Sequence, residues 1–267
     1  MHTRRCRRWV KIAADTRMAE AFAIFVAGFG VVWLLERRLH QLVQTLFLLL
    51  TGHNGAAMKL FAVVLLPGVF LHELSHWLMA RLLGVRVRRF SVMPKPQRNG
   101  ALRLGYVEVM RTDLLRTALI GIAPLAFGVA ALSAIGLRVF NLRAIAEALS
   151  KADLISAAGT LLALPQAPDA WLWAYVVFAV ANSMMPSESD VQALPPVVFG
   201  GFVVVGAVLI VGGLPLMQLL SPLIRAVLSW LAAAFAITAV LDLAIALALM
   251  LAIWLIGTIT QREVRLR

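Results

Sequence analysis

The most constraining stretch of the chain is an apolar run that contains three ionisable side chains. Residues 69–83 read V-F-L-H-E-L-S-H-W-L-M-A-R-L-L, and the apolar run begins near Met58. On a helix, His72 and His76 project from one face, and Glu73 lies about 100° round from His72. Two imidazoles and a carboxylate inside an apolar helix are costly unless they are paired or bind a metal. The stretch therefore predicts a metal site on a membrane helix.

The spacing His72-Glu73-x-x-His76 is that of zinc hydrolases. In such sites two imidazoles bind the metal and the glutamate activates a water molecule. The alternative is a pair of core histidines beside an unrelated glutamate. Because the apolar surroundings make that alternative costly, we expect His72 and His76 to bind Zn²⁺ and Glu73 to be the catalytic base.

The composition indicates a membrane protein. The chain is 61% hydrophobic and 14% charged, with a mean hydropathy of +0.89. Its net charge of +12 raises the possibility of nucleic-acid binding. However, the cations flank apolar segments and do not line a soluble face, so we expect a lipid bilayer and no nucleic acid as partner. Cys6 is the only cysteine, which excludes an internal disulfide.

The apolar runs predict an all-α, multi-pass membrane protein with about six transmembrane helices. We divide the chain into a basic cytoplasmic tail (1–18), one transmembrane domain (19–258) and a short basic tail (259–267). The sequence does not decide whether residues 42–50 and 140–168 lie in the membrane interface. The six expected spans are Ala19–Leu35, Met58–Leu83, Leu114–Leu137, Trp171–Met185, Val197–Leu220 and Ala226–Thr258.

The distribution of positive charge predicts the orientation. With six spans and both termini in the cytoplasm, 18 of the 25 lysines and arginines lie on the cytoplasmic side. The first apolar run is long for a signal peptide and no A-x-A-like site follows it, so we expect an uncleaved first span. We also expect a bacterial-type plasma membrane. In this orientation, His72 and His76 lie in the inner half of the second span, at a depth similar to residues 182–190.

Residues 85–110 change character. Short alternating runs flank Asn99-Gly100, a pair typical of a β-hairpin turn. A basic cytoplasmic loop is the alternative, and the sequence leaves both open. A hairpin would present an open strand edge that can pair with an extended peptide. Just before the metal motif, Pro67-Gly68 predicts a bend in the helix.

Two histidines leave the expected zinc site one protein ligand short. A catalytic zinc normally takes three protein ligands and a water molecule. The charge distribution brings Asp190 to the depth of the two histidines, whereas the other three histidines lie elsewhere in the chain. Asp190 is therefore the expected third ligand, and Glu188 is its local rival.

These motifs together resemble the site-2 protease family of intramembrane zinc metalloproteases. His72-Glu73-Leu74-Ser75-His76 resembles the family's H-E-x-x-H. Residues 121–125 (G-I-A-P-L) are similar to its small-residue G-P element. Asn182…Pro186…Asp190 resembles N-x-x-P-x-x-x-x-D-G, although Pro186 is one place late and Val191 replaces the glycine. The resemblance implies that Asp190 completes the zinc shell, that Asn182 supports it, and that a strand-forming loop follows the metal helix.

The expected function is zinc-dependent hydrolysis of a peptide bond in or near a substrate's transmembrane segment, close to the cytoplasmic face. The expected substrate is a single-span membrane protein or membrane peptide. Family members with PDZ or CBS domains are larger, and this chain has room for neither. Two alternatives stay open: a metallohydrolase of lipids or other small molecules, and a non-catalytic metal-bound scaffold. Asp242, an acidic residue in the last span, is expected to have a structural role.

Overall fold

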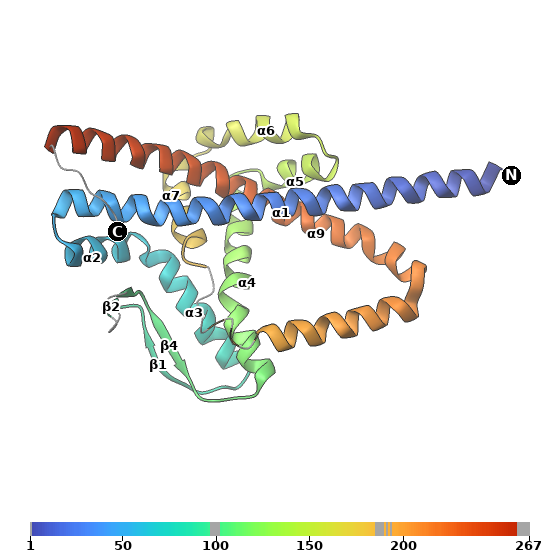
Figure 1. Ribbon diagram of the computed structural model, residues 1–267, viewed down its shortest axis with the longest axis horizontal. Coiled ribbons are helices and arrows are strands. Elements are labelled where there is room, and N and C mark those ends of the chain that lie inside the picture. The colour runs from blue at the N-terminus through green and yellow to red at the C-terminus, as the bar shows by residue number, and fades with distance from the viewer. Residues whose placement is uncertain (1, 97–101, 185–189, 191, 193, 261–267) are drawn as a thin grey trace.

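The protein is a bundle of helices with one small β-hairpin. The computed structural model describes residues 2–96, 102–184, 190, 192 and 194–260 (Figure 1). A long helix α1 crosses the bundle, and α4 runs nearly perpendicular to it in the view of Figure 1. The helices are α1 (His2–Thr51), α2 (Asn54–Val64), α3 (Leu66–Leu82), α4 (Leu114–Arg138), α5 (Leu142–Ser150), α6 (Leu154–Leu162), α7 (Ala170–Ala181) and α9 (Leu194–Thr260), with a 3-10 turn η1 (Leu164–Gln166).

Helix α1 is longer than the sequence predicts. The expected end of the first span at Leu35 is wrong, because the helix continues through the charged residues 36–38 to Thr51. Beyond these charges, Leu39 and Val43 are buried against α2, α3, α7 and α9. Neither glycine nor proline interrupts residues 31–51, so the helix has no local reason to stop there. Residues 42–50 thus belong to the apolar segment Ala19–Thr51.

The described helices confirm the all-α membrane class. In the described residues, four helical segments are long and apolar enough to cross a bilayer, or five if the bent pair α2–α3 counts as one span. Helix α7, expected as the fourth span, has only 12 residues. At 1.5 Å per residue it is about 18 Å long, short of the roughly 30 Å hydrocarbon core. The expected number of six spans is therefore not confirmed.

The predicted bend before the metal motif is present. Helices α2 and α3 meet at Leu65 with an angle of 66° between them. Pro67 lies in the first turn of α3, where its missing N–H is tolerated. The Tyr175 hydroxyl on α7 donates to the Val64 carbonyl at 3.0 Å, next to the break. The bend therefore begins α3 just ahead of its ionisable residues.

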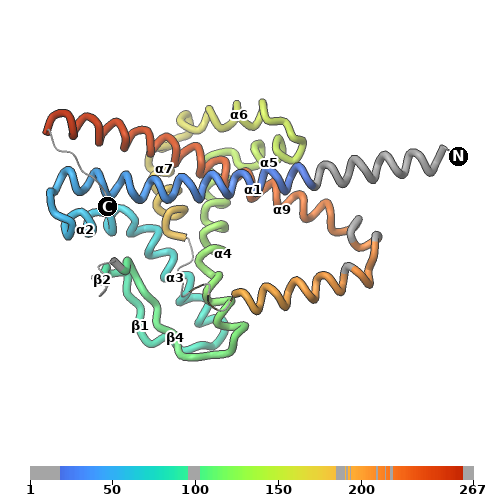
Figure 2. The backbone as a smooth tube through the Cα atoms, viewed as in Figure 1, coloured from blue at the N-terminus to red at the C-terminus, as the bar shows by residue number. Residues whose placement is uncertain are grey.

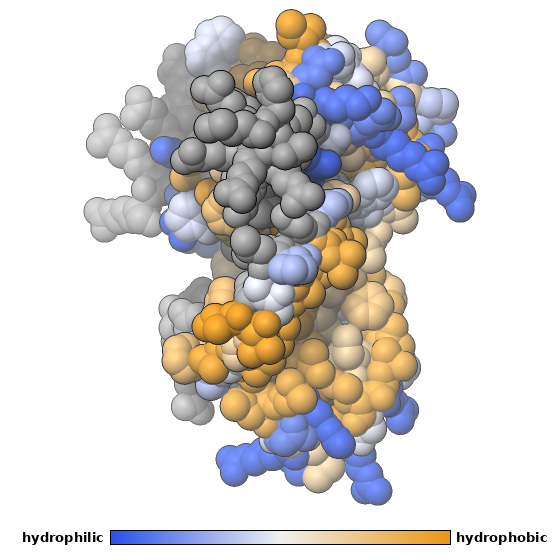
Figure 3. Space-filling model, turned by 90° about the vertical axis from the view of Figure 1, so that its right-hand side faces the viewer, coloured by the Kyte–Doolittle hydropathy of each residue, from blue (hydrophilic) through white to orange (hydrophobic). Residues whose placement is uncertain are grey.

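Helix α9 contains the last two apolar segments. Its backbone leaves helical geometry at Gly213 (φ 56°, ψ −155°), so its two arms diverge from that point (Figure 2). Glycine permits this positive φ at little cost. The arms provide the candidate spans Leu194–Gly213 and Leu219–Thr260, close to the two that the sequence predicts. Viewed from the side, apolar surface lies between hydrophilic ends, as expected for a face toward lipid (Figure 3).

The segment after α3 is a β-hairpin, which rules out the basic-loop interpretation. Strand β1 (Val87–Ser91) pairs antiparallel with β4 (Tyr106–Val109), with an irregularity between Val87 and Arg89. Farther out, β2 (Lys95–Pro96) pairs with β3 (Leu102–Arg103). The expected turn residues Asn99 and Gly100 lie outside the described residues. Residues 140–168 form the short helices α5, α6 and η1 beside α7 and α9.

Candidate metal centre

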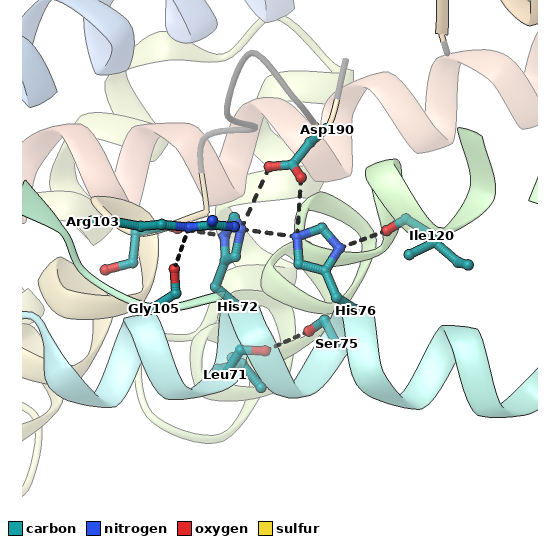
Figure 4. Close-up of polar contacts among 9 residues, drawn as sticks. Leu71, His72, Ser75, His76, Arg103, Gly105, Ile120 and Asp190 are labelled. Carbon is teal, nitrogen blue, oxygen red and sulfur yellow. Dashed lines mark hydrogen bonds and ion pairs between the residues drawn. The ribbon is translucent and has the colours of Figure 1, made fainter. Parts of the chain in front are cut away.

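Helix α3 brings the three motif residues into the interior. His72, Glu73 and His76 are 9%, 7% and 7% exposed. The two imidazoles point from the same side of α3 toward Asp190, which follows α7 in the chain (Figure 4). The four-residue spacing of the histidines therefore gives the shared face that the sequence predicts.

Backbone carbonyls fix the orientation of both imidazoles. Nδ1 of His72 lies 2.7 Å from the Ser183 carbonyl oxygen, and Nδ1 of His76 lies 2.8 Å from the Ile120 carbonyl oxygen. Because a carbonyl only accepts, each Nδ1 carries the donated hydrogen and each neutral ring presents a lone pair at Nε2. This is the arrangement in which protein histidines bind metals.

The two Nε2 atoms face each other and a carboxylate. They are 3.1 Å apart. Oδ1 of Asp190 is 3.3 Å from Nε2 of His76, and Oδ2 is 3.7 Å from Nε2 of His72. With both Nδ1 atoms protonated, the neutral rings have no hydrogen to place between these acceptors, so either an added proton or a metal ion would relieve their repulsion.

The spacing of these atoms fits zinc. Zn–N and Zn–O bonds of about 2.0–2.1 Å in a tetrahedron place the ligand atoms about 3.3–3.4 Å apart. The three observed separations, 3.1, 3.3 and 3.7 Å, bracket that value. His72, His76 and Asp190 are the group of His, Cys, Asp and Glu residues that could hold a metal ion within the described part of the chain. We refer to these three residues as the metal cluster.

A glycine on α4 makes room for Asp190. A Cβ atom on Gly121 would collide with the Asp190 carbonyl oxygen. The adjacent residue on α4, Ile120, provides the carbonyl that holds His76. The small-residue element expected in this span thus lets the Asp190 segment approach α3.

The β-hairpin lies against Glu73. A Cβ atom on Gly105, next to β4, would lie 2.7 Å from Cγ of Glu73. Arg103 Nε donates to the Gly105 carbonyl at 3.1 Å, and both residues lie beside His72 in Figure 4. The motif glutamate therefore lies between the metal cluster and the strand end of the hairpin.

The structure separates the expected site residues into two groups. It brings His72, His76 and Asp190 together and places Glu73 beside them. Glu188, the rival ligand, lies outside the described residues. Asn182 is buried at the end of α7, where its side chain contacts Asp242 and not the metal cluster.

Sequence patterns did not identify the groups that orient the site. The carbonyls of Ser183 and Ile120 are backbone atoms, which no side-chain motif reveals. Gly105 was also missed, although a glycine between two short strand patterns indicates a close approach.

One segment of the chain matches a known protein family. Residues 60–102 match the family model described as Peptidase family M50. This segment is similar to Peptidase family M50. The match confirms the resemblance to the site-2 protease family and contains H-E-x-x-H and the β1 segment, but it ends before Gly121 and Asn182. No curated protein and no solved structure matches the chain. The peptidase match and the long apolar helices together support a multi-pass membrane metalloprotease.

Proposed function

We propose that this protein is a zinc-dependent intramembrane protease. The observation that carries the proposal is the convergence of two imidazole lone pairs and a carboxylate at tetrahedral spacing beside Glu73. The peptidase-family match over residues 60–102 supports peptide hydrolysis over other metal chemistry. His72, His76 and Asp190 would hold the ion.

Glu73 is the proposed acid and base. Zinc bound at this site supplies a Lewis acid that polarises a carbonyl and lowers the pKa of water. Glu73 takes a proton from the attacking water while the water oxygen bonds to the scissile carbonyl carbon. Glu73 then gives this proton to the leaving nitrogen as the C–N bond breaks. The carboxylate is thus regenerated with each turnover. Burial of Glu73 keeps competing water away from this exchange.

The proposed substrate is a single-span membrane protein or membrane peptide. Carbonyls in a helix are held by i to i−4 hydrogen bonds, so the scissile segment must unwind before attack. The β-hairpin, which packs its Gly105 end on Glu73, offers strand edges that would hold an unwound segment by backbone hydrogen bonds. The bias of positive charge supports an orientation with both termini in the cytoplasm and the site near the cytoplasmic face, and the proposed location is a bacterial-type plasma membrane.

The test is cleavage of a labelled single-span peptide by the purified protein in detergent or vesicles. The wild type should cleave it, and a zinc chelator should stop cleavage until zinc is restored. Glu73→Gln should abolish cleavage and keep zinc, because it removes the base without removing a ligand. Wild-type turnover by Glu73→Gln would refute the role of Glu73. Zinc binding with hydrolysis of lipid but not peptide would favour the lipid-hydrolase alternative.

A further inference from the structure

A second buried polar cluster lies between α1, α7 and α9. It consists of Glu36 and His40 on α1, Asn182 at the end of α7, and Asp242 on α9; we call it the outer-helix cluster. Asp242 is fully buried, Asn182 is 4% exposed and Glu36 is 6% exposed. Glu36 lies within electrostatic reach of Asp242. Three buried polar side chains and one partly buried histidine among apolar helices are expensive and call for a physical reason.

The contacts of this cluster converge on Asn182. Nδ2 of Asn182 donates to the Phe178 carbonyl at 2.9 Å and to Oδ1 of Asp242 at 3.4 Å. Nε2 of His40 donates to the Asn182 backbone carbonyl at 3.2 Å. That carbonyl belongs to the peptide bond joining Asn182 to Ser183. Two outer helices therefore hold the side chain and the backbone of the same residue.

The same turn holds a residue of the metal cluster. The Ser183 carbonyl, one residue further on, accepts from Nδ1 of His72 at 2.7 Å. The Ser183 carbonyl belongs to the next peptide unit, so a shift of the Asn182–Ser183 turn would move this acceptor and release the His72 ring. Partners of this kind fix the tautomer and the ring orientation of a metal-binding histidine.

We propose that Asp242 and His40 are positioning residues for the metal centre: from α9 and α1, they fix the Asn182–Ser183 turn that orients the His72 imidazole. The inference rests on the metal centre proposed above. It explains why α1 and α9, which contribute no member of the metal cluster, bury polar groups at this depth. Neither residue touches the reacting atoms, so both act through His72.

Two disruptive substitutions and two controls separate positioning of the His72 ring from general stability. Asp242→Leu removes the acceptor but keeps the branched shape of the side chain, whereas Asp242→Asn keeps an acceptor oxygen for the Asn182 amide. His40→Phe removes the donor but keeps an aromatic ring against Phe61, which His40 meets edge-on. Ser229→Ala is the control, because Ser229 is also a buried polar residue of α9 and its Oγ has no hydrogen-bond partner in the described structure.

The first readout is zinc affinity of the purified, monodisperse variants. Asp242→Leu and His40→Phe should each lose about tenfold, the scale for disturbed outer contacts of metal ligands. Asp242→Asn and Ser229→Ala should stay near the wild type. If Asp242→Leu does not fold, the comparison of His40→Phe with Ser229→Ala decides. The proposal is overturned if folded Asp242→Leu and His40→Phe bind zinc as tightly as the wild type. It is also overturned if Ser229→Ala loses as much zinc affinity as they do.

The second readout needs no metal. Nitrogen NMR of labelled histidines in the metal-free protein reports which ring nitrogen is protonated, and His72→Ala assigns the signal. The wild type should show His72 protonated at Nδ1, and Asp242→Leu or His40→Phe should show a mixture of tautomers. An unchanged His72 tautomer in both variants contradicts positioning. A changed tautomer in a protein that binds no zinc would instead leave positioning intact and refute the proposed function.

Discussion

The metal cluster and the outer-helix cluster lie on the two sides of the Asn182–Ser183 turn, and they differ in how they are built. In the metal cluster both Nδ1 atoms have carbonyl partners, and the remaining lone pairs converge. In the outer-helix cluster, Oδ1 of Asn182 and Oδ2 of Asp242 are buried without a hydrogen-bond partner in the described structure. The first cluster directs three ligand atoms toward one point, whereas the second leaves two buried oxygen atoms without a hydrogen-bond partner.

The two clusters also differ in how far apart their residues lie in the sequence. His72 and His76 are one helical turn apart, so helix geometry alone places them together. The outer-helix cluster joins residues separated by 60 and 142 positions. Its geometry depends on how three helices pack, and small changes in packing should affect it first.

Removing Asp190 should cause the largest loss of zinc affinity and cleavage. Asp190→Ala removes a carboxylate from the metal cluster. It should lower zinc affinity about tenfold or more and abolish cleavage. Glu188→Ala, two residues away, is the matched control and should keep most of both. Isothermal titration with zinc measures the difference. A loss confined to Glu188→Ala would move the ligand two residues upstream.

A smaller effect is expected at Gly121. A Cβ atom there would collide with the Asp190 carbonyl oxygen, so Gly121→Ala should displace that ligand and lower zinc affinity by about tenfold. The control is Gly201→Ala on α9, where a Cβ meets no atom within 4 Å. Zinc titration of both variants is the measurement. Equal affinities for Gly121→Ala and Gly201→Ala would show that Asp190 does not depend on this close approach.

The smallest effect on the metal should come from the hairpin. Proline in β1, at a position whose N–H points away from β4, removes one edge donor without touching the metal cluster. Peptide cleavage should fall while zinc affinity stays unchanged. The measurement is the rate at which each proline variant of β1 cleaves the single-span peptide. Cleavage at the wild-type rate in every proline variant would exclude β1 as the edge that receives substrate.

Local patterns predicted the residues of the site better than they predicted the spans. The spacing of His72 and His76, the bend at Pro67 and the hairpin after α3 follow from short-range geometry, and the structure contains all three. The end of the first span at Leu35 was wrong because the charges that suggested it do not end the helix: Glu36 is buried in the outer-helix cluster, and Arg37 and Arg38 are exposed.

Long-range contacts explain what the sequence could not predict. Asn182 belongs to the element that resembles the family's Asn-to-Asp motif, yet its side chain faces Asp242 and not the metal cluster. Asp242 was expected to be structural, and its pairing with α7 is visible only once the helices are packed. The carbonyls of Ser183 and Ile120 leave no trace in the side-chain pattern.

Metal content decides whether His72, His76 and Asp190 form a zinc site. The purified protein, supplied with zinc and then dialysed, should retain one zinc per chain, and X-ray absorption should show imidazole nitrogen and carboxylate oxygen at about 2.0–2.2 Å. The double variant His72→Ala, His76→Ala should retain none, whereas Glu73→Gln should retain the wild-type amount. If the wild-type protein does not retain zinc, or if the double variant binds it equally well, these residues do not form a zinc site.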